Sequence, residues 1–330
     1  MQEVNKQRDI TFDIMKGIGI LLVMIGHVYS QYLPNTHHLI YTFHMPMFFL
    51  IAGFFSKAYE NKASSIASIK KYFVRLVIPM VFTQILFVLW HVLLVFTKGE
   101  SWTNAIAQFT SLFWADVYCP STKYGPLSLG VTWFLMALFV SKTLFLFLSR
   151  FKLWAIPMSL LIALIAILLH KVFPYSIWCF TLGMTALPFV TFGWIVHNYK
   201  IPIWIIVISI ACWPIAYLFL GNLDIYHFVW PCWPVNVLAA CGATYCIYWL
   251  CLWIGKHTRF LSKGLAHLGV ASLAIMCVHD FEIGSHLGNH LRVLFGLDLP
   301  VGWLYVWRYM ITIIIAFALV HIPKVKRIFV

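Results

Sequence analysis

The first apolar stretch of the chain carries three ionisable residues whose spacing would place them on one side of a helix. Lys16 and His27 are eleven residues apart, which corresponds to three helical turns plus about 20°. Asp13 is fourteen residues from His27 and lies about 40° from the same line. One helix face would therefore carry a carboxylate, an ammonium group and an imidazole. An imidazole can accept a proton from a hydroxyl group, and an ammonium group can bind an anion.

Each of these residues also has a structural interpretation. Asp13 and Lys16 could form an i,i+3 ion pair at a membrane interface, or Lys16 could extend to the lipid headgroups. His27 could simply bond to a neighbouring helix. The alignment of all three residues, with Gly26 beside His27 to permit close approach, favours a functional group over three unrelated residues.

The composition indicates that these residues lie in a membrane protein. Hydrophobic residues make up 62% of the 330 residues and charged residues only 10%, whereas about 25% charged residues are usual in soluble domains. A helix needs about 20 apolar residues to cross a bilayer. We therefore predict one all-α domain over residues 1–330, a bundle of about ten transmembrane helices over 10–33, 39–57, 73–97, 128–149, 153–171, 177–197, 202–220, 229–254, 266–287 and 301–322.

The positions of the basic residues predict the orientation of this bundle. If the N-terminus is cytoplasmic, the inner segments carry sixteen Lys and Arg residues and the outer segments four. Basic residues concentrate on the cytoplasmic side of membrane proteins. Both termini are therefore predicted to be cytoplasmic, in a multi-pass protein of the cell membrane. The net charge of +13 follows from this topology, so we expect no nucleic-acid partner.

Several polar residues are predicted to lie at the depth of His27, in the outer half of the membrane. They are His44, Trp133, His279, Asp280 and Glu282. Ionisable groups inside a bilayer are costly and usually serve a function or pair with each other. We predict one polar chamber, although the same groups could meet interfacial water separately. At the cytoplasmic end, Lys71 and Arg75 are interpreted either as a basic flank of the third helix or as a phosphate-binding site.

Two motifs and several weaker ones resemble a known family. Residues 13–27 read DIMKGIGILLVMIGH, and residues 43–54 read FHMPMFFLIAGF. Residues 71–79, 133–135 and 268–279 resemble later features, so the similarity covers nearly the whole chain. The chain resembles the acyltransferase-3 family of membrane O-acyltransferases, in particular its fucose-4-O-acetylase-like branch, which modifies sugars and polysaccharides. It departs from the usual pattern because Lys16 replaces the common Arg of the first helix and Tyr72 replaces the first Arg of an Arg-x-x-Arg motif.

The resemblance implies transfer of an acyl group, usually acetyl, from cytoplasmic acetyl-CoA to a sugar or glycan hydroxyl at the outer side. Lys16, Lys71 and Arg75 are then expected to bind the CoA phosphates. His27 is the expected general base, with Asp13 on its helix face and Glu282 or Asp280 as the orienting carboxylate. We expect His44, Trp133 and His279 to contact the acceptor. No metal site is expected, because no His-Glu-x-x-His motif is present.

Two other classes of function fit the intramembrane charges. A transporter or flippase for a lipid-linked sugar or a small anion would use charged residues and broken helices in the same way, but would be expected to show internal repeats, which the chain lacks. A sensor or scaffold would have no chemistry at all. Acceptor-dependent transfer from acetyl-CoA separates the three interpretations.

Overall fold

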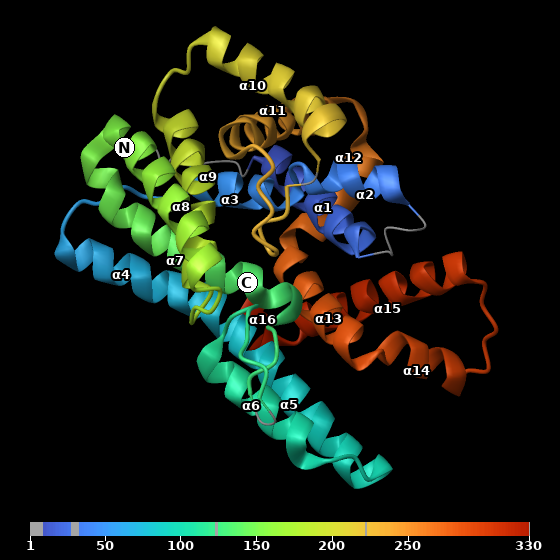
Figure 1. Ribbon diagram of the computed structural model, residues 1–330. Coiled ribbons are helices and arrows are strands. Elements are labelled where there is room, and N and C mark those ends of the chain that lie inside the picture. The colour runs from blue at the N-terminus through green and yellow to red at the C-terminus, as the bar shows by residue number, and fades with distance from the viewer. Residues whose placement is uncertain (1–8, 28–32, 123–124, 222, 330) are drawn as a thin grey trace.

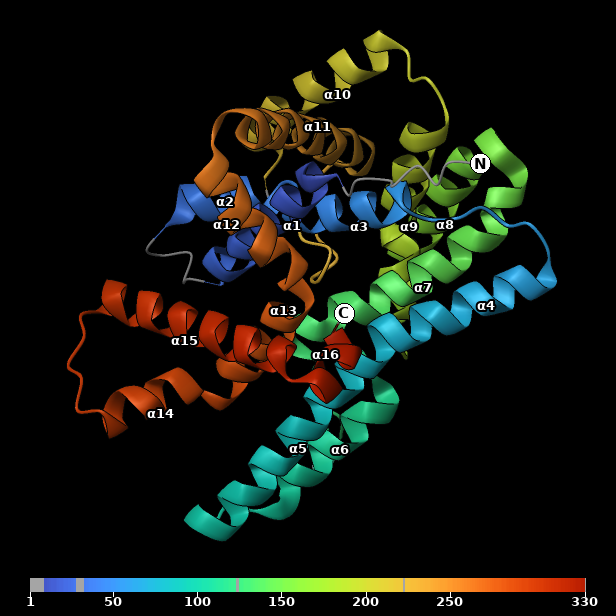
Figure 2. The same ribbon diagram turned by 180° about the vertical axis from the view of Figure 1, so that it is seen from behind.

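The computed structural model describes residues 9–27, 33–122, 125–221 and 223–329. Within these ranges the regular structure is helical, and an isolated antiparallel bridge joins Asp224 to Val229. Figure 1 shows the arrangement, and Figure 2 shows it from behind. The α-helices are α1 (Ile10–Gly26), α2 (Pro34–Tyr41), α3 (His44–Phe54), α4 (Lys62–Tyr72), α5 (Ile78–Lys98), α6 (Trp102–Trp114), α7 (Trp133–Leu148), α8 (Ala155–Val172), α9 (Phe180–Asn198), α10 (Ile203–Ile215), α11 (Trp233–His257), α12 (Arg259–Val270), α13 (Ser272–Ser285), α14 (Leu287–Leu294), α15 (Val301–His321) and α16 (Pro323–Phe329).

Among the described residues, four short helices of other types connect these elements. Two are π-helices, η1 (Phe73–Val77) between α4 and α5 and η4 (Ala216–Leu220) after α10. Two are 3₁₀ helices, η2 (Gly130–Thr132) before α7 and η3 (Ser149–Trp154) between α7 and α8. The chain turns within η3 at Lys152, whose φ is 52°. This turn separates α7 from α8 and matches the predicted break between the fourth and fifth spans.

In the part of the chain that the structure describes, six helical runs are long and apolar enough to cross a membrane, and a seventh is obtained if the bent pair of α12 and α13 counts as one span. One of these runs, Gly130–Val172, contains both α7 and α8, which lie on either side of the turn at Lys152. The helices α1 and α3, with 17 and 11 residues, are shorter than these runs. The all-helical membrane fold is confirmed, whereas the count of ten spans and the cytoplasmic termini stay predictions.

The structure changes the boundaries of two predicted spans. Residues 39–57 do not form one helix, because Thr42 and Phe43 separate α2 from α3. The third span begins earlier than predicted, since α4, η1 and α5 form one helical run over Lys62–Lys98. The segment between the predicted third and fourth spans contains α6.

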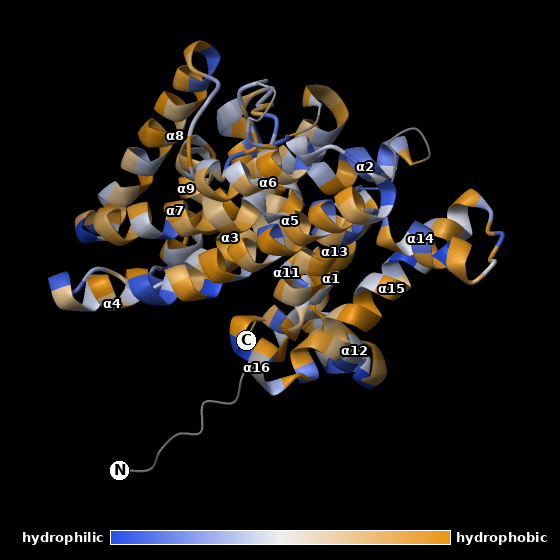
Figure 3. Ribbon diagram, turned by 90° about the horizontal axis from the view of Figure 1, so that it is seen from below, coloured by the Kyte–Doolittle hydropathy of each residue, from blue (hydrophilic) through white to orange (hydrophobic). Residues whose placement is uncertain are grey.

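The outer surface of the helices is largely apolar. Figure 3 shows hydrophobic residues along much of α3, α5 and α8, with hydrophilic residues gathered on α2, α4 and α12. Large apolar side chains such as Leu168, Val207 and Ile314 are exposed. An apolar surface of this extent is typical of contact with lipid.

Glycines allow the helices around the predicted site to pack closely. A Cβ atom on Gly269 of α12 would overlap the backbone of Asp13, and one on Gly17 would overlap the backbone of Leu265. In the same way α3 packs against α9, where a Cβ on Gly53 would overlap Val190. Small residues permit this approach of helix backbones in membranes. The packing holds α1 and α3 in a fixed relation to the rest of the bundle.

A bend directs α13 toward the centre of the molecule. The axes of α12 and α13 differ by 66° across Ala271, and α13 then packs against α5 and α15. The hydroxyl of Tyr309 on α15 donates a hydrogen bond of 2.6 Å to the carbonyl of Met24, near the end of α1. These contacts bring the carboxyl-terminal half of α13 to the same place as the end of α1.

Candidate active site

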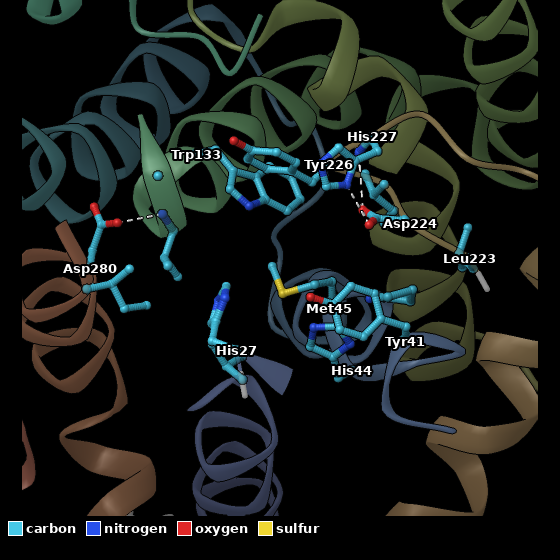
Figure 4. A pocket seen from close by; sticks show the side chains of 16 residues that line it. His27, Tyr41, His44, Met45, Trp133, Leu223, Asp224, Tyr226, His227 and Asp280 are labelled. Carbon is cyan, nitrogen blue, oxygen red and sulfur yellow. Dashed lines mark hydrogen bonds and ion pairs between the residues drawn. The ribbon is translucent and has the colours of Figure 1, made fainter. Parts of the chain in front are cut away.

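A cavity of about 310 Å³ lies where the end of α1, the start of α3, the start of α7 and the middle of α13 meet. Residues 223–227, between η4 and α11, form another wall, and α2 and η2 contribute the rest (Figure 4). The residues that line the cavity are Val23, His27, Tyr41, His44, Met45, Pro46, Gly130, Val131, Trp133, Leu223, Asp224, Ile225, Tyr226, His227, Asp280 and Ile283. Of the residues assigned to the predicted polar chamber, His27, His44, Trp133 and Asp280 line this cavity, whereas His279 and Glu282 do not.

His27 is the C-cap residue of α1 and faces the cavity. Its ring centroid lies 5.4 Å from that of His279 on α13. His279 is 1% exposed, and neither of its ring nitrogens has a hydrogen-bond partner among the described residues. His279 therefore lies beside His27 rather than in the cavity lining, where a substrate-binding residue was expected.

His44 and Trp133 line the cavity as predicted for acceptor-binding residues. The Nδ1 atom of His44 lies 2.9 Å from the carbonyl oxygen of Ile40. Because a carbonyl only accepts, this bond assigns the proton to Nδ1 and leaves Nε2 as an acceptor. The Trp133 ring is packed 5.9 Å from the ring of Tyr226.

Asp280 is the carboxylate that α13 contributes to the cavity. Its Oδ1 accepts a 2.6 Å hydrogen bond from the backbone N–H of Val131, and its Oδ2 is buried with no partner among the described residues. The contact depends on Gly130, which has a φ of 64° and whose Cβ would overlap Oδ1. Gly130 is thus needed for its left-handed backbone and for space.

Glu282, the predicted catalytic carboxylate, lies elsewhere. Its Oε1 is 2.7 Å from Nε of Arg308 and its Oε2 is 3.1 Å from the second guanidinium nitrogen. The side chain is almost fully buried and does not line the cavity. This paired arrangement satisfies both charges. Of the two carboxylates that the sequence left open, Asp280 lines the cavity and Glu282 does not.

Asp13 and Lys16 lie at the opposite end of α1. The Lys16 ammonium is 2.7 Å from Asp13 Oδ1, so the predicted i,i+3 pair is formed. Fourteen residues of helix separate Asp13 from His27 by about 21 Å. Asp13 is therefore too far from His27 for direct proton exchange and contacts Lys16 instead; a catalytic role for Asp13 stays a prediction.

A second group of basic residues lies at the corresponding end of α3. Lys142 of α7 donates hydrogen bonds of 3.1 Å to the carbonyl of Ala52 and 2.9 Å to the hydroxyl of Ser56, and its ammonium lies 4.6 Å from the Tyr72 ring centroid. Lys71 and Arg75 are exposed nearby and repel this ammonium electrostatically.

The α1 end that carries Lys16 also packs against this end of α3. The Phe12 ring lies 4.7 Å from that of Phe54 and 4.8 Å from that of Phe55. Basic groups therefore gather near the end of α3, whereas its first residue, His44, lines the cavity. The eleven residues of α3 span about 16 Å between the two sites.

The sequence profile of the acyltransferase domain matches residues 9–322. The chain belongs to the acyltransferase-3 family. Membership identifies a membrane acyltransferase, which has an acyl donor and an acceptor, and it favours acyl transfer over the transport interpretation. The cavity is accordingly the candidate active site of an acyltransferase-3 protein.

Two relatives match parts of this acyltransferase-3 chain. Nodulation protein NolL of Sinorhizobium fredii is 38% identical over 84 residues, which cover 23% of each chain. Nodulation protein NolL of Mesorhizobium japonicum is 29% identical over 164 residues, which cover 46% of this chain and 40% of the relative. The matched segments thus span less than half of these relatives. No solved structure matches the chain.

Sequence reasoning missed two groups in this acyltransferase-3 site. Lys142 belongs to no motif, although a lysine in an apolar helix is itself a signal of function. The loop residues Asp224, Tyr226 and His227 carried no motif. Within the described ranges, no three His, Cys, Asp or Glu side chains are grouped as a metal ion would require.

Proposed function

We propose that the protein is a cell-membrane O-acyltransferase that moves an acetyl group from cytoplasmic acetyl-CoA to a hydroxyl of a sugar or glycan at the outer side. The observation that carries this proposal is that basic residues lie near one end of α3 and a histidine-containing cavity lies at the other end. The basic residues, called the basic cluster below, are Lys16, Lys71, Arg75 and Lys142. The distance of about 16 Å along α3 is on the order of the length of an extended pantetheine arm.

In this proposal the CoA phosphates bind Lys16, Lys71, Arg75 and Lys142, and the thioester reaches His27. His27 accepts the proton of the acceptor hydroxyl while the oxygen attacks the thioester carbonyl carbon. The tetrahedral intermediate then expels the CoA thiolate, which takes the proton from the His27 imidazolium. His44 Nε2 is suited to accept a hydrogen bond from the sugar. One domain, matching the family over residues 9–322, carries all these groups.

The direct test uses purified protein in nanodiscs with acetyl-CoA and a series of sugar glycosides. We expect release of free CoA that requires a sugar, with a matching acetylated glycoside detected by mass spectrometry. Sugar movement across a vesicle membrane without acetylation would instead support the transporter interpretation.

The donor site gives a prediction of its own. The substitutions Lys16→Ala, Arg75→Ala and Lys142→Met should each weaken CoA binding by about 10- to 100-fold. Each of them removes a charge-assisted bond to phosphate. Calorimetric titration with CoA provides the measurement. Lys256→Ala is the matched control, since Lys256 is an exposed lysine of α11. Unchanged affinity in all three variants would remove the basic cluster from the donor site.

The proposed topology gives another prediction. In a background without the natural cysteines, single cysteines at positions 60–68 should react with an impermeant maleimide only from the cytoplasmic side, because this segment follows the basic inner pattern. A cysteine at position 227 should react only from the outside. Labelling of both positions from the same side would contradict the proposed orientation.

A further inference from the structure

The loop between η4 and α11 is a structured wall of the cavity. Asp224 and Val229 exchange backbone hydrogen bonds of 3.0 and 2.8 Å, which closes the segment Leu223–Trp230 into a hairpin. Phe228, with a φ of 53°, stacks its ring on His170 of α8 at 3.7 Å. Leu223 and Ile225 are each 3% exposed. The hairpin is therefore anchored from both sides and presents a fixed surface.

The polar groups of this hairpin lie across the cavity from the histidines of α1 and α3. Figure 4 shows Asp224, Tyr226 and His227 on one side, with His27 and His44 on the other. The Asp224 Oδ2 atom is 2.7 Å from Nδ1 of His227, and Oδ1 accepts the backbone N–H of His227 at 3.1 Å. A carboxylate has about four acceptor sites, so Asp224 is held in place while keeping capacity for further donors.

Aromatic rings flank this carboxylate. The Tyr226 ring packs edge-on against Trp133, and its hydroxyl is 2.8 Å from that of Ser128. Burial raises the pKa of the Tyr226 phenol, so it remains a neutral hydrogen-bonding group. Rings beside a fixed carboxylate provide both an apolar surface and acceptors for hydroxyl groups.

The charges of the lining also restrict what can bind. Of the sixteen lining residues, Asp224 and Asp280 are acidic and none is Lys or Arg. Among the described residues that line the cavity, a uronate or phosphate group would meet two carboxylates and no Lys or Arg, and like charges repel each other. An uncharged hydroxylated ligand meets no such repulsion.

We infer that the hairpin Leu223–Trp230 is the acceptor-binding wall and that it selects an uncharged sugar. In this inference Asp224 accepts hydrogen bonds from two adjacent hydroxyls, His227 positions Asp224, and the rings of Tyr226 and Trp133 contact the apolar face of the sugar. The inference rests on the proposed function, because it names the class of acceptor for that reaction.

The test compares wild type with Asp224→Asn, and uses Asp298→Asn, an exposed aspartate outside the cavity, as the matched control. Acetyl transfer is measured at saturating acetyl-CoA with a neutral methyl glycoside, its uronic acid counterpart and its amino-sugar counterpart. Wild type should use the neutral glycoside at least about tenfold better than the uronate. Asp224→Asn should raise the acceptor KM by about tenfold or more, as loss of bonds to a charged group predicts, with CoA affinity unchanged.

Glycoside binding is measured in parallel by saturation-transfer difference NMR, which needs no catalysis. Binding of the neutral glycoside to wild type and its loss in Asp224→Asn would support the inference even if no acetyl group were transferred. Equal use of neutral sugar and uronate, preference for the amino sugar, or an unchanged acceptor KM in Asp224→Asn would overturn it. If one of these results is found and the wild-type protein still transfers acetyl groups to the sugar, the inference fails but the proposed function stands. Absence of both binding and transfer would overturn both.

Discussion

Replacing His27 by Gln is expected to lower the rate of acetyl transfer by about 10² to 10⁴-fold, the usual effect of losing a general base. An acceptor hydroxyl is almost fully protonated at neutral pH, so it needs a base at the point of attack. His27 faces the cavity that also contains His44, Trp133 and Asp280. Gln preserves much of the size and polarity of the imidazole but cannot take up the proton.

The measurement is acceptor-dependent CoA release at saturating donor and acceptor, beside CoA affinity and thermal unfolding of the same sample. His267→Gln is the matched control, because His267 is exposed on α12. A second variant, His279→Gln, separates the two members of the histidine pair, and we expect a smaller loss because His279 does not line the cavity. Turnover near the wild-type rate in a folded His27→Gln protein would exclude His27 as the base.

Replacing Glu282 by Gln is expected to destabilise the fold by about 3–5 kcal/mol, because one partner of a buried ion pair is removed. Arg308, whose side chain is 18% exposed, would be left without its two carboxylate bonds. Replacing both residues, with Glu282→Gln and Arg308→Met together, removes the unpaired charge. The double variant should therefore recover most of the lost stability.

Thermal unfolding and acetyl transfer of the two single variants and the double variant make up the experiment. If the pair is structural, stability and activity should return together in the double variant. A conservative control is Glu60→Gln, an exposed glutamate before α4. If Glu282→Gln is stable but inactive, and Arg308→Met brings no recovery, Glu282 is catalytic as its sequence position first indicated.

The two acidic residues of α13 illustrate why the sequence could not assign this role. Asp280 and Glu282 are two residues apart, so their side chains differ by about 200° around the helix axis. The two side chains lie at nearly the same depth along the helix, as the sequence predicts, but they point in nearly opposite directions from its axis. Which of them meets the cavity depends on the 66° bend at Ala271 and on the position of α15. Only the packed structure contains this information.

The sequence by itself determined the membrane class, the family resemblance and the common depth of His27, His44 and Trp133, because composition and helix rise are local properties. It did not determine the pairing of Lys142 with the end of α3, the placing of His279 beside His27, or the hairpin with Asp224. These depend on contacts between segments far apart in the chain, such as Phe228 stacked on His170 and Gly130 packed against Asp280. Such contacts form only when the helices pack, so the tertiary structure alone decided them.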